Sequence, residues 1–121
     1  MNVISERLIP YRSFLVQQKE RLTQQIFLLE SQNRQDEANL AKIRLNIFGV
    51  FETVAAADEK AASSWEDFCL RYESRFQTLT APWKARLEKA VCNSDTHTRF
   101  TEEIKLSTAN CIQAAFLSIK E

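Results

Sequence analysis

His97 is the only histidine of the chain, and histidine is the side chain whose ordinary pKa best suits acid–base chemistry near neutral pH. It lies two residues after Asp95 in the polar stretch 92–98, CNSDTHT. A catalytic histidine needs an oriented partner and a pocket, and this stretch predicts neither. We therefore interpret His97 as a solvated loop residue.

The three cysteines, Cys69, Cys92 and Cys111, are the other candidate nucleophiles and metal ligands. Their number is odd and no C-x-x-C pair occurs, which argues against a disulfide framework or zinc finger and favours a reducing compartment. The Glu-x-x-His triplets of di-iron bundles are also absent. We expect no metal or cofactor. Cys69 and Cys111 should pack in the core, and Cys92, at a helix end, should be the most exposed thiol.

A shortage of glycine argues against other enzyme classes. The chain has one glycine, Gly49, whereas average usage is about seven per cent. Phosphate-binding loops and the sharp turns that hold nucleophilic serines both need glycine at fixed positions. We therefore expect a protein that is not an enzyme.

The same shortage predicts the fold, because sheets and loop-rich folds need glycine and proline for their turns. With only two prolines and many good helix formers, the chain reads as one all-α domain over 1–121. We predict an up-down four-helix bundle, with helices at about 10–31, 36–62, 64–92 and 95–120. Pro10 should lie in the first turn of the first helix, and Pro82 should kink the third.

Apolar residues at helical spacing predict the buried faces. The first helix has Tyr11, Leu15, Leu22, Ile26 and Leu29, and the third has the aromatic series Trp65, Phe68, Tyr72, Phe76 and Leu79. In the last helix the expected inner stripe is Phe100, Ile104, Ser107, Cys111, Ala114 or Ala115, and Leu117. Ser64 and Asp95 have the types and positions of N-caps.

The first bend is open to two interpretations. Residues 31–37 include no apolar side chain, and Asn33 with Asp36 resembles a capping box. However, the bend has neither Gly nor Pro, and a seven-residue apolar register continues across it. The alternative to a hairpin is an extended dimer with one long helix over about 11–60, roughly 75 Å in length. We favour the hairpin.

Charge composition bears on possible partners. Sixteen basic residues balance sixteen acidic ones, which makes nucleic acid an unlikely partner and leaves little repulsion against self-association. A small nucleic-acid-binding regulator remains the alternative function, with a basic helix face formed by Arg71, Arg75, Lys84, Arg86 and Lys89. No apolar stretch approaches the roughly 18 residues of a membrane span, and the N-terminus lacks a secretory pattern. We expect a cytoplasmic protein.

Four phenylalanines lie beside the main apolar stripes rather than on them: Phe27, Phe48, Phe51 and Phe116. They widen the apolar arc beyond about three positions per heptad, which a broad core or a second buried surface could use. We take them as candidate partner-binding residues. The expected function is a non-enzymatic helical interaction module (an adaptor, chaperone-like or scaffold protein), which forms a homodimer or offers an apolar groove to another helical protein.

Overall fold

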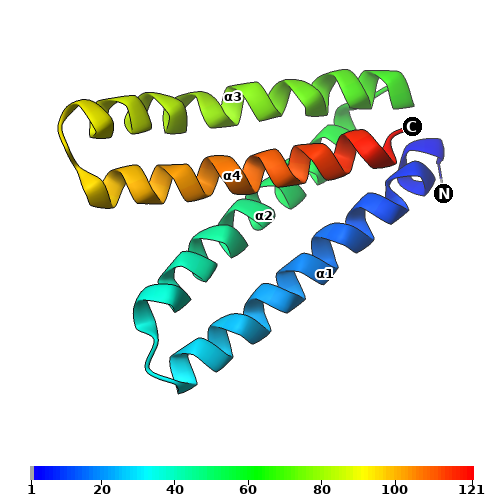
Figure 1. Cartoon of the computed structure of the whole chain (residues 1–121). Helices are drawn as coiled ribbons and strands as arrows, with labels where there is room; N and C mark the ends of the chain where they lie inside the picture. The colour runs from blue at the N-terminus through cyan, green and yellow to red at the C-terminus, as the bar shows by residue number, and fades with distance from the viewer. Residues whose placement is uncertain (1) are drawn as a thin grey trace.

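The computed structural model describes residues 2–121 and consists of four helices: α1 (Val3–Ser31), α2 (Gln35–Ala61), α3 (Trp65–Cys92) and α4 (Thr96–Ile119). The predicted all-α four-helix bundle is confirmed. Helices α1 and α2 form one hairpin, and α3 and α4 form the other. The hairpins converge where both chain termini lie, the closed end, and diverge toward the two hairpin turns, the open end (Figure 1).

Both hairpin turns have the same backbone conformation, and neither contains a glycine. Asn33 and Ser94 adopt φ values of 58° and 55°, the left-handed conformation that commonly ends a helix. The amide of the following residue then reaches back to the helix: Arg34 N–H donates to the Leu29 carbonyl at 2.9 Å, and Asp95 N–H donates to the Ala90 carbonyl at 2.8 Å. The long-helix alternative for residues 11–60 is therefore not adopted. Gly49 takes no part in either turn, because it lies inside α2.

Some of the predicted helix caps are confirmed. Ser64 Oγ accepts from Asp67 N–H at 3.0 Å, and Asp95 Oδ1 accepts from Thr98 N–H at 3.1 Å. The capping box at Asn33 and Asp36 is wrong. Asn33 is itself the left-handed residue that follows the end of α1, so it does not cap α2. Helix α2 begins after Arg34 without a side-chain cap.

The two prolines lie inside helices, and the expected place of Pro10 is wrong. Helix α1 begins at Val3 because Asn2 Oδ1 accepts from Ser5 N–H at 2.8 Å, so Pro10 lies well inside the helix. Pro82 likewise lies inside α3, which continues to Cys92. Each proline leaves the carbonyl four residues earlier without its helical donor. Those carbonyls belong to exposed residues, where water can hydrate them.

The core is densest at the closed end, where all four helices meet. Fully buried aromatic rings from each helix contact one another there: Tyr11, Phe51, Phe68, Tyr72 and Phe116. The Phe116 ring centroid lies 5.1 Å from that of Tyr11 and 5.0 Å from that of Tyr72, both edge-to-face. The predicted aromatic face of α3 is thus confirmed as core.

The predicted inner stripe of α4 is wrong except at Ile104. Phe100, Ser107, Cys111 and Leu117 are exposed, and the buried stripe is Ile104, Thr108, Ile112 and Phe116. The sequence offers two overlapping stripes on this helix. The helix turns the larger one inward, since Ile112 and Phe116 remove more apolar area from water than Ser107 and Cys111 would.

The two hairpins repeat one another at an offset of 61 residues, the separation of Tyr11 and Tyr72. The left-handed turn residues Asn33 and Ser94 have the same separation. Further positions are buried in both hairpins at this offset, namely Ile4 with Trp65, Leu15 with Phe76, Phe51 with Ile112 and Ala55 with Phe116. The hairpins therefore meet through equivalent surfaces.

Polar contacts between the hairpins also lie at the closed end. The buried hydroxyls of Tyr11 and Tyr72 form a hydrogen bond, and the Tyr72 hydroxyl donates to the Phe51 carbonyl at 3.2 Å. Since Tyr72 has one proton and gives it to Phe51, Tyr11 donates to Tyr72. Burial raises the pKa of both phenols, so both stay protonated. Nearby, Arg75 binds both oxygens of buried Asp58, at 2.8 and 3.2 Å.

Tyr72→Phe should lower the free energy of unfolding by about 1–3 kcal/mol, because it leaves the Tyr11 hydroxyl buried without a partner. Tyr11→Phe should cost only about 0.5–1.5 kcal/mol, since Tyr72 keeps its bond to Phe51. The double variant should be more stable than Tyr72→Phe alone, because it leaves no hydroxyl unpaired. Urea unfolding followed by circular dichroism measures all three. Equal and additive costs would contradict this account of the pair.

Ser94→Gly should raise the free energy of unfolding by up to about 1.6 kcal/mol. It releases left-handed strain of roughly 1–2 kcal/mol and gives back about 0.4–1 kcal/mol to the freer unfolded chain. Ser94→Ala is the matched control, because it removes the hydroxyl but keeps the Cβ atom. Thermal unfolding would contradict the assignment if the alanine variant gained as much as the glycine variant.

Candidate interaction surfaces

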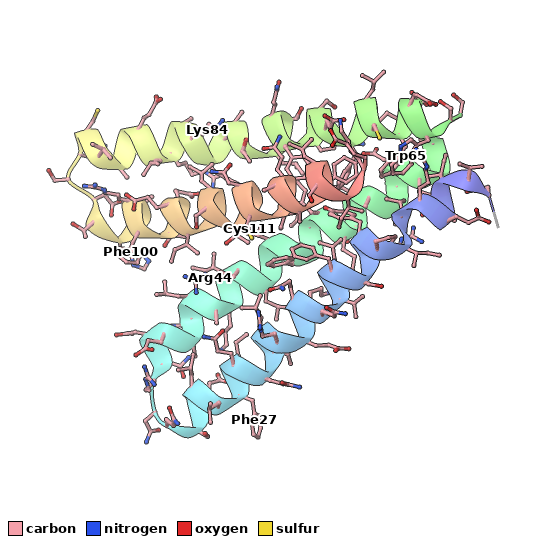
Figure 2. The ribbon with its side chains drawn as sticks, turned by 45° about the vertical axis from the view of Figure 1, so that its right-hand side comes forward. Phe27, Arg44, Trp65, Lys84, Phe100 and Cys111 are labelled. Atoms are coloured by element: carbon pink, nitrogen blue, oxygen red, sulfur yellow. The ribbon has the colours of Figure 1, made fainter. Side chains whose placement is uncertain are left out.

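The four candidate phenylalanines separate into core and surface. Phe48, Phe51 and Phe116 are buried, so their rings contribute to the bundle and leave little area for a partner. Only Phe27 is exposed, with 78% of its area accessible. It lies near the end of α1 and points away from the other hairpin (Figure 2). Of the four, Phe27 alone exposes most of its ring to a partner.

An open cleft lies between the hairpins toward the open end. We call it the inter-hairpin cleft; its volume is about 390 Å³ and it is lined by Asp36, Asn39, Leu40 and Ile43 on α2 and by Thr96, His97, Phe100 and Thr101 on α4. Phe100 projects from α4 toward the gap and is 55% exposed (Figure 2). The cleft exists because the hairpins are joined at the closed end and diverge from it. Its apolar floor and polar rim resemble those of peptide-binding grooves.

A second hollow lies where α4 crosses the first hairpin. We call it the three-helix groove; its volume is about 320 Å³ and it is lined by Gln18, Arg21, Leu22 and Gln25 on α1, Arg44 and Phe48 on α2, and Ser107, Thr108 and Cys111 on α4. Arg44 and Cys111 occupy the facing sides of α2 and α4 (Figure 2). Two arginines are the only charged residues of this lining.

A third hollow, of about 620 Å³, lies at the closed end between the start of α1 and the connection from α2 to α3. Arg7 and Trp65 lie on its wall, and the Arg7 guanidinium is 5.3 Å from the centre of the Trp65 ring. This cation–π contact joins the two hairpins. The position of the two side chains is therefore explained by the fold itself.

His97 lies on the rim of the inter-hairpin cleft, with Asp36 on the opposite helix. Its carbonyl accepts from Thr101 Oγ1 at 3.1 Å, but within residues 2–121 its imidazole forms no hydrogen bond that would orient it. In the same range no three His, Cys, Asp or Glu side chains are grouped so that they could hold a metal ion. The rim position makes His97 a polar neighbour of whatever occupies the cleft.

The five basic residues proposed for a nucleic-acid face all lie on α3, and three of them are ion-paired. Arg71 pairs with Asp67, Arg75 with Asp58 and Arg86 with Glu102. Glu102, which was not singled out in the sequence, is a buried carboxylate that also accepts from Lys105 at 3.2 Å. These pairs neutralise much of the face, and nucleic-acid binding stays a prediction from sequence alone.

Most other exposed apolar side chains are spread over the surface, including Val3, Ile9, Val16, Leu70 and Val91. Single exposed apolar residues are normal on a folded protein and need no partner. None of the four helices, which lie within residues 2–121, combines the length and apolarity needed to cross a membrane.

The interaction surfaces depend on residues that the sequence did not reveal. Phe100 was assigned to the inner face of α4, but together with Leu40 and Ile43 of α2 it lines an open cleft. The sequence did not indicate that Arg21 and Arg44 share one surface, because only the crossing of α1, α2 and α4 brings them to the same groove. The missing information is the angle between the hairpins.

The three thiols differ in exposure. Cys92 is exposed, as expected, and Cys69 is half-buried beside the core. The expectation that Cys111 packs in the core is wrong, since it is exposed on the wall of the three-helix groove. Burial, with Glu73 nearby, raises the pKa of the Cys69 thiol and so lowers its thiolate fraction.

Alkylation at mildly alkaline pH should therefore be faster at Cys92 and Cys111 than at Cys69, because the thiolate is the reacting form. Trypsin places the cysteines in separate peptides, residues 61–71, 90–99 and 106–120, so mass spectrometry can follow each rate. Unfolding in urea should bring the three rates together. Faster labelling of Cys69 in the folded protein would contradict its placement.

Comparison with known proteins found no matching family model, no matching curated protein and no matching solved structure. What the chain does is therefore inferred from the surfaces described above.

Proposed function

We propose that this protein is a non-enzymatic helical interaction module that forms a homodimer through its inter-hairpin cleft. The observation that carries this proposal is the exposed Phe100 ring, which faces Leu40 and Ile43 across an open, mostly apolar cleft. An apolar helix from a different protein is the alternative occupant.

The energetics favour association that is weak and concentration-dependent. Full burial of a phenylalanine, leucine or isoleucine side chain stabilises by about 1.5–3 kcal/mol each. Association itself costs about 4–15 kcal/mol in lost freedom. A symmetric dimer buries three such side chains from each copy, but two of the three are already half-buried, so further contacts must contribute to meet the higher estimates of that cost. A net charge of zero leaves little repulsion between copies. Phe27, exposed and outside the cleft, stays a candidate contact for a separate partner.

Phe100→Asp should weaken or abolish the dimer, because it places a charge in the apolar interface. Size-exclusion chromatography with light scattering measures the mass over a range of concentrations. The unmodified protein should move from 14.0 kDa toward twice that mass as its concentration rises. The variant should stay near the monomer mass.

Leu70→Asp is the matched control. Leu70 is 74% exposed on α3, near the closed end and outside the cleft, so this variant should dimerise normally. A protein that stays monomeric at every concentration would reject the homodimer. Equal weakening by both variants would show that the cleft is not the interface.

A further inference from the structure

We propose that the three-helix groove binds an acidic segment of another protein, with carboxylates of that segment paired to Arg21 and Arg44. This inference rests on the proposed role as an interaction module and names a partner for a surface other than the dimer cleft. It is carried by the charges, the floor and the size of the groove.

The charge of the groove is unusual for this chain. Ten ion pairs form within residues 2–121, and they include most of the lysines and arginines. Arg21 and Arg44 take part in none of them, although both lie on the wall of one hollow. No Asp or Glu lies in that wall. A balanced protein therefore presents a local excess of positive charge here, and charge complementarity requires an acidic occupant.

The other residues of the wall suit a peptide. Leu22 and Phe48 form a buried apolar floor, and Gln18 and Gln25 also line the groove. Guanidinium groups bind carboxylates through two parallel hydrogen bonds, which orients the bound group as well as attracting it. An acidic residue with an apolar neighbour can therefore satisfy both the rim and the floor.

The size of the groove favours side chains of a larger partner. A volume of about 320 Å³ is at the lower limit of small-molecule sites and holds about ten water molecules at roughly 30 Å³ each. That space takes one or two side chains. Nucleic acid fits less well, because binding through phosphates needs a broad basic surface and only two cations converge here.

The test uses the full chain and two synthetic helical peptides. One has leucines along one face and glutamates along the other, and its counterpart has lysine at every glutamate. The acidic peptide should bind, and added salt should weaken it, whereas the basic peptide should not bind. Arg44→Glu should weaken binding of the acidic peptide about tenfold or more, because it both removes an attraction and adds a repulsion.

Lys60→Glu is the matched control, since it changes the net charge equally but lies at an exposed position in the last turn of α2, outside the groove. It should leave binding nearly unchanged. Circular dichroism reports whether each variant keeps its helices. Arg21→Gln, at an exposed position, is a milder second variant that should also weaken binding.

The alkylation rates of the thiols report where the peptide binds. Bound acidic peptide should slow alkylation of Cys111 on the groove wall and leave Cys92, exposed at the end of α3, unaffected. Equal binding of the two peptides, full binding by Arg44→Glu, or an unprotected Cys111 would each overturn the proposal. Tighter binding of an oligonucleotide that depends on Arg21 and Arg44 would replace the acidic segment with nucleic acid.

The two proposals can fail separately. A protein that dimerises through Phe100 but ignores the acidic peptide loses only the groove assignment. A protein that stays monomeric but binds the peptide at Arg44 loses the homodimer and keeps the groove.

Discussion

The contact between Tyr11 and Tyr72 at the closed end joins the two hairpins, and the rest of the architecture follows from its position. It lies among rings from all four helices, and the Arg75 pair with Asp58 and the stacking of Arg7 on Trp65 also join the hairpins in this half of the molecule. A hydrogen bond between buried hydroxyls tolerates no slippage, because a hydroxyl left unpaired costs more than the bond contributes. The closed end therefore sets how the hairpins meet.

The surfaces available for binding are a consequence of that localised contact. Helices held together at one end can diverge at the other, and here the divergence leaves Phe100, Leu40 and Ile43 facing an open cleft. The crossing of α4 over the first hairpin likewise brings Arg21 and Arg44 to one groove. Both hollows are lined by helices of both hairpins, so a change in the hairpin angle would alter them together.

Where the residues decide local geometry, the sequence allowed good predictions. Helix content, the aromatic face of α3 and the caps at Ser64 and Asp95 follow from periodicity and side-chain chemistry over a few neighbouring positions. The turn between α1 and α2 was harder to predict, because Asn33 adopts a left-handed conformation that is usual for glycine. The buried stripe of α4 was mispredicted, because two apolar stripes overlap on that helix. Only its packing against the other three helices selects which stripe is buried.

The sequence by itself therefore determined the class of fold, since a chain almost without glycine and rich in helix formers has few other structures open to it. It also determined the approximate helix boundaries, except the start of α1 at Val3. Only the tertiary structure decided which apolar residues beside the main stripes of α1 and α3 became core. It buried Phe48, Phe51 and Phe116, exposed Phe27 and Phe100, and placed two arginines, which form no ion pair within residues 2–121, on the wall of one groove. The physical reason is that burial and local charge depend on the angle at which helices cross, which no local pattern encodes.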